Sequence, residues 1–230
     1  VYKRQPPTRV KAAPDRILRP AQAAYLERLL PPRSGVLAQI EREARKARVP
    51  IVDPEVGLFL DQVVRASGVR SALEVGTAIG YSGTWIASAL PPDGRLVTID
   101  VDPDRVATAK RHFGEAGVAA KVECLLGPGL EVLRGVEGPF DLLFLDALKE
   151  EYRGYLLIAL PKLRVGGVVV CDNLLWGGQV AEKVRKADER DSTEALRKFN
   201  PWFLEHPQLR AQILPLGDGT GFAVKLAAAP

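Results

Sequence analysis

The sequence predicts a single-domain α/β protein with a doubly wound, mostly parallel sheet, a reversed last strand and extra helices at the amino-terminal end. Three observations predict this class. Short apolar runs alternate with helical patterns five times from residue 71 onward. Two of these runs, at residues 142–145 and 168–171, are continuously apolar, which is typical of strands buried on both faces of a parallel sheet. The chain then closes with a Gly-Asp-Gly turn between two strand-like segments, which indicates an antiparallel hairpin.

Helical spacing precedes the alternating region. Apolar residues recur at intervals of three and four across residues 20–47, and Pro31 and Pro32 divide this stretch into two helices. Asp53 followed by Pro54 is typical of a capped helix start and predicts a third helix over residues 56–66. Residues 1–19 are basic and contain prolines, so we expect a disordered leader there, followed by one domain over residues 20–230.

Five strand–helix units follow, and each strand ends at or just before a glycine or an aspartate. The predicted strands are residues 72–75, 96–100, 122–126, 142–145 and 168–171. The segments that follow them are helices over residues 80–90, 103–116, 130–133 and 152–163, and a charged stretch over residues 180–199. Because each helix returns the chain to the same end of the sheet, the strands should be parallel, in a Rossmann-like arrangement. Strands 211–216 and 221–226 complete the sheet as a hairpin.

Composition excludes several classes of protein. The 230 residues are 47% hydrophobic, enough for one core, and contain neither an apolar run of 18 residues nor a secretory signal, so we expect a cytoplasmic protein without a membrane span. The net charge of +4 comes from dispersed basic residues, which argues against nucleic-acid binding. Cys124 and Cys171 are expected to be buried free thiols, and His112 and His206 to lie at the surface. These four residues are too few for a zinc site or a histidine-based hydrolase.

The loop after the first strand predicts a cofactor site. Gly76 and Gly80 would let the backbone approach a ligand, but Ala78 stands where a dinucleotide fingerprint needs glycine, and no P-loop is present. Glu74 suits a cationic ligand better than a pyrophosphate, and Asp100 at the end of the second strand can accept both ribose hydroxyls. An adenosine-bearing, cationic cofactor meets these conditions, and we expect S-adenosylmethionine. A purely structural glycine turn is the alternative.

Oxygen ligands follow two other strands. Asp146 ends one apolar run, and Asp172 with Asn173 ends another. Because the carboxyl ends of parallel strands meet at one edge of a sheet, we expect these three side chains to lie together. Two carboxylates and an amide oxygen suit Mg²⁺, with Ca²⁺ or Mn²⁺ as alternatives in the same site. Taken singly, such residues also serve as turn formers at strand ends.

These segments together resemble the cation-dependent class I O-methyltransferases, the family of caffeoyl-CoA and catechol O-methyltransferases. The resemblance covers residues 25–226 and rests on residues 73–76, 80–82, 146–149, 172–180 and 214–219. It implies an S-adenosylmethionine-dependent, divalent-cation-dependent O-methyltransferase domain. The implied substrate is a vicinal-dihydroxy aromatic compound of the catechol, flavonoid or hydroxycinnamoyl type, methylated on one hydroxyl. Members are commonly homodimers, so we expect a homodimer with the amino-terminal helices at its interface.

The resemblance also assigns roles to residues. It implies metal ligation by Asp146, Asp172 and Asn173. It implies cofactor contacts by Val52, Glu74, Gly76, Thr77, Ser82, Asp100, Gly129 and Asp146. Lys149, three residues after Asp146, matches the general base, although a solvated surface lysine is the alternative. Trp176 is a candidate wall for the aromatic substrate, which Lys149 would also contact, or else a packing residue.

Two features leave alternatives open. Leu148 replaces the second aspartate of the Asp-Ala-Asp-Lys segment common in bacterial relatives, which affects the substrate mouth more than the chemistry. Residues 182–197 alternate in charge and predict a solvated helix or a lid over the site. Other functions are a metal-independent methyltransferase, which Asp172 and Asn173 argue against, and a non-catalytic cofactor-binding module, which Lys149 argues against. A nucleotide-linked dehydrogenase lacks its second loop glycine.

Overall fold

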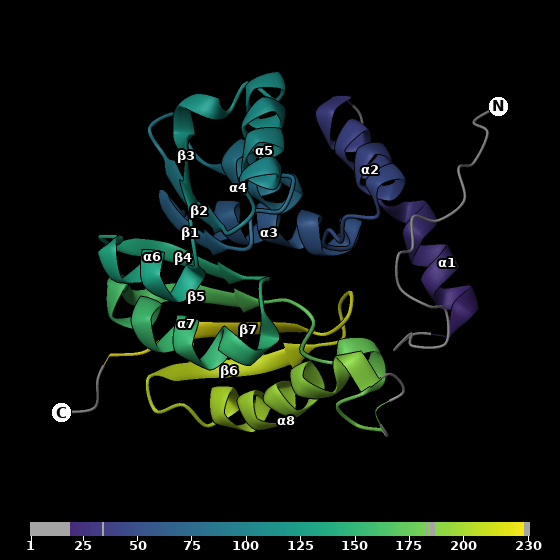
Figure 1. Ribbon diagram of the computed structural model, residues 1–230, viewed down its shortest axis with the longest axis vertical. Coiled ribbons are helices and arrows are strands. Elements are labelled where there is room, and N and C mark those ends of the chain that lie inside the picture. The colour runs from purple at the N-terminus through teal and green to yellow at the C-terminus, as the bar shows by residue number, and fades with distance from the viewer. Residues whose placement is uncertain (1–18, 34, 183, 185–186, 228–230) are drawn as a thin grey trace.

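The computed structural model describes residues 19–33, 35–182, 184 and 187–227. Residues 1–18 of the predicted leader lie outside the described residues. Within the described part, one seven-stranded sheet carries helices on both of its faces (Figure 1). No described helix is both long and apolar enough to cross a membrane.

The sheet has the strand order β3-β2-β1-β4-β5-β7-β6. Its strands are β1 (Ser71–Val75), β2 (Arg95–Asp100), β3 (Val122–Leu126), β4 (Phe140–Leu145), β5 (Leu163–Cys171), β6 (Leu209–Leu214) and β7 (Thr220–Lys225). Strands β1 to β5 are parallel, and β7 runs antiparallel to both β5 and β6. The predicted sheet with its reversed strand is therefore confirmed. The order reverses between β1 and β4, which is the switch point where ligands bind in such sheets.

The helices also follow the predicted pattern. They are α1 (Pro20–Leu29), α2 (Gly35–Ala47), α3 (Pro54–Ala66), α4 (Tyr81–Ala89), α5 (Pro103–Glu115), α6 (Gly129–Gly135), α7 (Tyr152–Ala159) and α8 (Arg190–Leu204). A 3₁₀ turn, Lys149–Glu151, precedes α7. Asp102 caps α5 by accepting the backbone N–H groups of Asp104 and Arg105, and Pro103 stands at its first turn.

The core consists of two apolar clusters, one on each face of the sheet. Phe144 and Val170 pack with residues of α2, α3, α4 and α5. Leu143 and Val169, one position earlier on the same strands, pack with residues of α6, α7 and α8. Because both faces of β4 and β5 are covered, these strands are apolar without alternation. The covered sheet gives the carboxyl ends of its central strands a rigid support.

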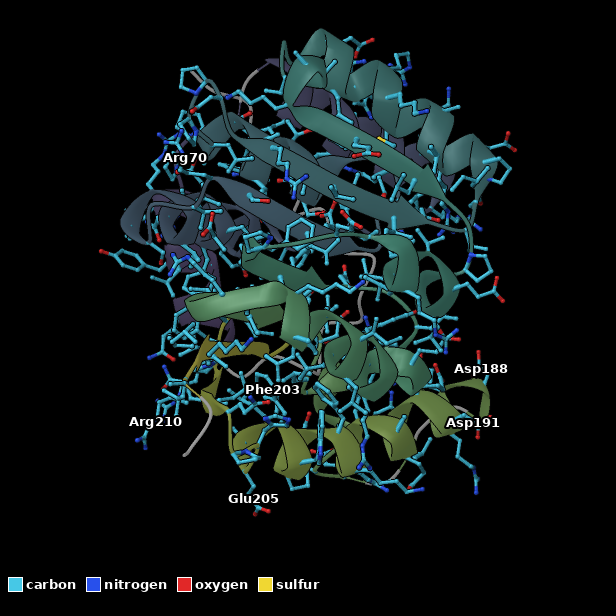
Figure 2. The ribbon with its side chains drawn as sticks, turned by 90° about the vertical axis from the view of Figure 1, so that its left-hand side faces the viewer. Arg70, Asp188, Asp191, Phe203, Glu205 and Arg210 are labelled. Carbon is cyan, nitrogen blue, oxygen red and sulfur yellow. The ribbon has the colours of Figure 1, made fainter. Side chains whose placement is uncertain are left out.

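Two expectations from the sequence are wrong. Helix α8 begins at Arg190 and is not a solvated surface helix, because Leu196, Phe199 and Phe203 recur at helical spacing and are buried. Figure 2 shows Phe203 pointing from α8 toward the sheet, while Asp191 points outward. His112 is not at the surface but fully buried, because α2 covers this side of α5 and supplies a hydrogen-bond partner.

The cysteines and the second histidine also differ in burial. Cys171 is buried as expected, whereas Cys124 is only half-buried, because it lies on the edge strand β3. Both thiols are free. His206 is partly exposed in the turn after α8 and accepts the backbone N–H of Gln208.

Candidate active site

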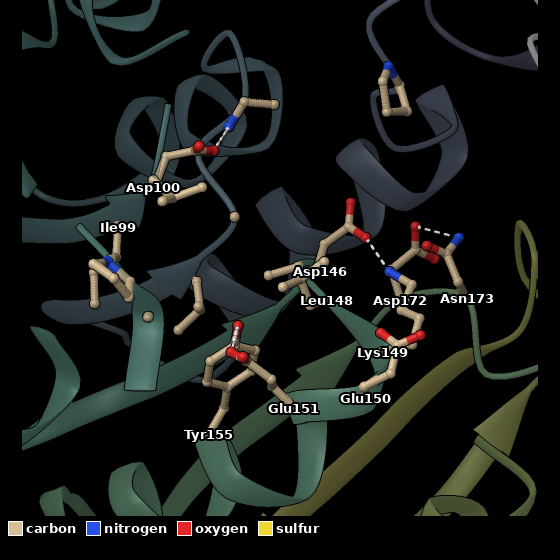
Figure 3. A pocket seen from close by; sticks show the side chains of 18 of the residues that line it. Ile99, Asp100, Asp146, Leu148, Lys149, Glu150, Glu151, Tyr155, Asp172 and Asn173 are labelled. Carbon is tan, nitrogen blue, oxygen red and sulfur yellow. Dashed lines mark hydrogen bonds and ion pairs between the residues drawn. The ribbon is translucent and has the colours of Figure 1, made fainter. Parts of the chain in front are cut away.

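A pocket of about 480 Å³ lies at the carboxyl ends of β1, β2, β4 and β5 (Figure 3). Its size is that of a small-molecule site. Eight of the residues that the sequence assigned to a site line it, namely Gly76, Asp100, Gly129, Asp146, Lys149, Asp172, Asn173 and Trp176. Four do not line it, namely Val52, Glu74, Thr77 and Ser82, and all four are buried. The sheet thus brings together residues that are up to 100 positions apart in the sequence, from Gly76 to Trp176.

The loop from Gly76 to Gly80 needs both glycines for packing. Gly76 has a φ of +108°, and a Cβ atom there would lie 2.1 Å from the carbonyl oxygen of Asp146. Gly80 has a φ of +87°, and a Cβ atom would lie 3.1 Å from the ring of Phe113 on α5. Gly76 also lines the pocket, but Gly80 does not. Of the two glycines, Gly76 therefore offers its backbone to a ligand in the pocket, whereas Gly80 makes room for helix α5.

Asp100 holds the tip of this loop. Its Oδ2 accepts the backbone N–H of Ala78 at 2.7 Å, and its Oδ1 accepts the backbone N–H of Asp102 at 3.0 Å. Each carboxylate oxygen has a second lone pair, so the group can accept further hydroxyl donors from the pocket. Gly129 opens helix α6 nearby, where a Cβ atom would lie 2.8 Å from the ring of Tyr155. This end of the pocket suits a flat, hydroxyl-bearing ligand.

A buried polar network supports the loop from beneath. Glu74 is fully buried and accepts hydrogen bonds from Ser82 Oγ and Thr98 Oγ1, both at 2.6 Å. Because the Thr98 proton goes to Glu74, the Thr77 hydroxyl donates to Thr98 Oγ1 at 2.5 Å. Burial raises the pKa of Glu74 to about 7; Ser82 and Thr98 oppose this, and the charges of Asp146 and Asp100 add to it. Glu74 therefore lies beneath the loop, bonded to its neighbours, and does not line the pocket.

Three oxygen-bearing side chains form the rim between β4 and β5. Asp146 follows β4, while Asp172 and Asn173 follow β5 and are buried. Asn173 Nδ2 donates to Asp172 Oδ2 at 3.0 Å, so the amide oxygen is directed elsewhere. In the described part of the chain no group of three His, Cys, Asp or Glu side chains could hold a metal ion. The predicted ligand set is instead two carboxylates and an amide, a donor chemistry that fits Mg²⁺, Ca²⁺ or Mn²⁺.

The closing hairpin holds the loop after Asn173 in an unusual conformation. Asn173 has a φ of +65° and Trp176 a φ of +48°. Asparagine adopts this left-handed region more readily than other residues with a side chain, whereas a tryptophan there is held by its surroundings. The backbone N–H of Leu174 donates to Gly219 O at 2.8 Å, and the N–H of Gly177 donates to Asp218 Oδ1 at 2.7 Å. The hairpin therefore presents Asn173 and Trp176 to the pocket. The Gly-Asp-Gly turn was the sequence signal for the hairpin, but not for this contact.

Lys149 lies at the same rim and is buried, so the interpretation as a solvated surface lysine is wrong. Its Nζ donates to Asp146 Oδ1 at 2.8 Å and to the Tyr152 hydroxyl at 2.8 Å. The centroid of the Trp176 ring is 5.7 Å from Lys149 Nζ. Burial raises the pKa of the Tyr152 phenol well above its ordinary value. The sequence assigned no role to Tyr152 or to Thr98. For Thr98, the only indication in the sequence was a single polar residue within the apolar run of β2.

Comparison with known proteins identifies the family of this chain. The family model for O-methyltransferases matches residues 32–226. A catechol O-methyltransferase of Mycobacterium tuberculosis is 34% identical over 209 residues, which cover 88% of this chain and 93% of that protein. Among solved structures, the O-methyltransferase TomG of Streptomyces achromogenes, in complex with S-adenosylmethionine, has a TM-score of 0.79 and 32% identity, covering 90% of this chain and 96% of that one.

A second structure carries the demethylated cofactor. The O-methyltransferase of Bacillus cereus in complex with S-adenosylhomocysteine has a TM-score of 0.79 and 28% identity, covering 89% of this chain and 97% of that one. The family match spans most of the chain, and the pocket lies at the switch point of the sheet. The chain belongs to the O-methyltransferase family and is an S-adenosylmethionine-dependent enzyme.

Proposed function

We propose that the protein is a divalent-cation-dependent O-methyltransferase that methylates one hydroxyl of a vicinal-dihydroxy aromatic substrate of the catechol, flavonoid or hydroxycinnamoyl type. The observation that carries the proposal is the position of Lys149. Its Nζ lies 2.8 Å from Asp146 Oδ1, in a pocket that Asp172 and Asn173 also line. A base beside a set of hard oxygen donors is the arrangement that deprotonation and methylation of a catechol needs. The name of the mycobacterial relative supports the catechol class.

The rim residues would hold the cation. Asp146, Asp172 and Asn173 supply hard oxygen donors that suit Mg²⁺, and Ca²⁺ or Mn²⁺ would suit the same donors. When bound, the cation would fix two adjacent hydroxyl groups and make one of them more acidic. Trp176 lines the same pocket and would orient the ring of the substrate.

The other end of the pocket would hold the methyl donor, whose sulfonium carries an electrophilic methyl group. Asp100 would accept the ribose hydroxyls, the backbone at Gly76 and Gly129 would pack against the ligand, and Asp146 would lie near its amino group. The buried residues Val52, Glu74, Thr77 and Ser82 would act by holding the loops that line this end, since they do not line it themselves.

The chain's own contribution to the reaction is proton transfer and alignment. Lys149 takes the proton as the O–H bond of the reacting hydroxyl breaks. The freed oxygen pair forms the new O–CH₃ bond while the S–CH₃ bond breaks, and its electron pair stays on sulfur, which leaves neutral S-adenosylhomocysteine. The pocket aligns the oxygen, the methyl carbon and the sulfur, and that positioning supplies a large share of the acceleration.

The direct test is methyl transfer from labelled S-adenosylmethionine to a panel of catechols, flavonoids and hydroxycinnamoyl thioesters. We expect activity with Mg²⁺, loss of activity in EDTA and recovery on adding Mg²⁺ in excess. Asn173→Ala should bind S-adenosylhomocysteine normally but require more Mg²⁺ for half-maximal rate. Activity that EDTA leaves unchanged would overturn the metal assignment, while S-adenosylhomocysteine binding without methylation of any panel member would overturn the substrate assignment.

The same proposal includes a homodimer, a small aromatic diol as the substrate and a cytoplasmic location, with neither nucleic acid nor membrane as a partner. Helix α1 carries three exposed apolar side chains, Tyr25, Leu26 and Leu29, which would be buried against a second copy. Sedimentation equilibrium should give twice the chain mass for the wild type and a lower mass for Leu26→Glu. A monomeric wild type at micromolar concentration would exclude this interface.

A further inference from the structure

The hydroxyl of Tyr152 lies where the proposed base and the proposed metal ligands meet. Tyr152 begins helix α7 and is fully buried. Its oxygen is 2.8 Å from Lys149 Nζ, 3.1 Å from the carbonyl oxygen of Leu145 and 3.0 Å from the carbonyl oxygen of Asp172. Leu145 immediately precedes Asp146 in the chain. The Tyr152 hydroxyl thus contacts the proposed base and also the backbone at the ends of β4 and β5, next to the proposed metal ligands.

The direction of these hydrogen bonds follows from the donors available. The two carbonyl oxygens can only accept, and a phenol has one proton to donate. The Tyr152 proton therefore goes to the carbonyl oxygens of Leu145 and Asp172, and its oxygen has to accept from Lys149. Asp146 Oδ1, as a carboxylate oxygen, also accepts from Lys149.

The side-chain nitrogen of Lys149 has three tetrahedral positions besides its bond to carbon. Two of them are taken by acceptors, one by Asp146 and the other by Tyr152. The third position is left for the pocket that Lys149 lines. We infer that Tyr152 is a positioning residue that directs this third position of Lys149 Nζ toward the reacting hydroxyl of the substrate. This inference rests on the proposed role of Lys149 as the base.

The same hydroxyl also sets the distance between the base and the rim. The backbone N–H of Asp172 donates to Leu145 O at 3.0 Å, so the two strand ends are already joined there. Tyr152 adds a side chain from α7 to that junction, and its ring packs edge-on against Phe199 with centroids 5.5 Å apart. A base has to lie within hydrogen-bond reach of its proton, and a displacement of about 1 Å costs on the order of 100-fold in rate.

Tyr152→Phe removes the hydroxyl and keeps the ring that packs against Phe199. We expect kcat to fall about 10-fold to 100-fold, while KM for S-adenosylmethionine and the affinity for S-adenosylhomocysteine stay within about twofold. Rates are expressed per S-adenosylhomocysteine-binding site, so that an unfolded fraction does not lower the value. The matched control is Tyr81→Phe, which removes another buried hydroxyl, bonded to Glu41 at 2.7 Å and outside the pocket. Its kcat should remain unchanged.

A double-mutant cycle with Lys149→Met separates positioning from a general structural role. If Tyr152 acts through Lys149, then Tyr152→Phe has no further effect in the Lys149→Met background, measured in single turnovers with enzyme in excess. Multiplicative effects of the two substitutions, or an unchanged kcat in Tyr152→Phe, would overturn the inference and leave the proposed function in place. Full activity in Lys149→Met would instead overturn the assignment of the base itself.

Discussion

Replacing Glu74 by glutamine should change how the stability of the protein depends on pH. Glu74 is fully buried and its pKa is raised to about 7 from an ordinary value of 4.5, with burial as the largest cause. Between these two values the folded protein holds a proton that the unfolded chain releases. The stability contributed by the protonated group is therefore complete below pH 4.5 and is lost as the pH rises through 7.

The size of the effect follows from the same two values. Each pKa unit corresponds to about 1.36 kcal/mol, so ionisation of Glu74 at alkaline pH costs the folded state on the order of 3 kcal/mol. Glutamine has nearly the same shape and carries no charge. Its amide oxygen can accept from Ser82, and its amide nitrogen can donate to Thr98, whose hydroxyl then donates to Thr77. The variant should therefore keep the network without the alkaline penalty.

Urea unfolding of both proteins at one-unit steps from pH 5 to pH 9, with EDTA and without cofactor, measures this directly. Every other titrating group is common to the two proteins, so the difference between their free energies of unfolding isolates Glu74. We expect the stability of Glu74→Gln relative to the wild type to increase by about 2.5 kcal/mol as the pH rises across that range, because a small part of the effect is already present at pH 5. A difference that is flat within about 1 kcal/mol, or that grows toward acid pH, would refute the reasoning. It would mean that the two hydroxyl donors outweigh the cost of burying the charge.

Three further substitutions test the packing around the site. Gly76→Ala would place a methyl group 2.1 Å from Asp146 O at a φ of +108°. It should lower the free energy of unfolding by at least about 2 kcal/mol and weaken the binding of S-adenosylhomocysteine, measured by calorimetry. Normal binding would contradict this. His112→Ala removes a fully buried ring and its hydrogen bonds to Glu43 and to Ile79 O, so urea unfolding should show a loss of at least about 3 kcal/mol; a loss below about 1 kcal/mol would contradict this burial. Leu148→Asp changes an exposed side chain at the mouth of the pocket, so it should raise KM for an apolar catechol in initial-rate assays without changing stability. An unchanged KM would show that Leu148 does not contact the substrate.

The position of the rim was predictable because it depends on sheet topology. Asp146, Asp172 and Asn173 each follow an apolar strand, and strands joined through helices run parallel, so their ends meet. The role of Lys149 came only from resemblance to a family, because a lysine in the run Lys-Glu-Glu carries no local sign that it is buried. Its burial follows from the position of the 3₁₀ turn between β4 and α7, which no periodicity in the sequence indicates.

Helix α8 shows how a local pattern can mislead. The alternating charges of residues 182–197 suggest a solvated face, yet Leu196, Phe199 and Phe203 lie on the opposite side and cover β5 and the hairpin from α8. The apolar stripe extends beyond the charged stretch, so a window that stops at residue 197 contains one member of the stripe. A longer window would have identified an amphipathic helix.

The buried hydrogen bonds beneath the site were not predictable, because their partners come from different elements. Thr98 on β2 contacts Glu74 on β1, and Tyr152 on α7 contacts the carbonyl oxygen of Asp172 after β5. Each pairing depends on the strand order and on the seating of a helix against the sheet, not on spacing along the chain. A buried polar group that lacks a partner costs about 1–3 kcal/mol, so such groups persist where a specific orientation is needed.

That requirement divides the polar residues of the site into two kinds with different consequences. Asp100 and Asp146 line the pocket, and their removal should weaken ligand binding directly. Glu74 and Tyr152 are enclosed by protein and face no ligand, so their removal should act through the angle and distance of the groups above them. Reacting groups have to be held to within about 0.5 Å. Substitutions of the enclosed residues Glu74 and Tyr152 should therefore lower kcat more than they raise KM. If such variants instead raised KM for the cofactor, these residues would shape the pocket and would not align the reacting groups.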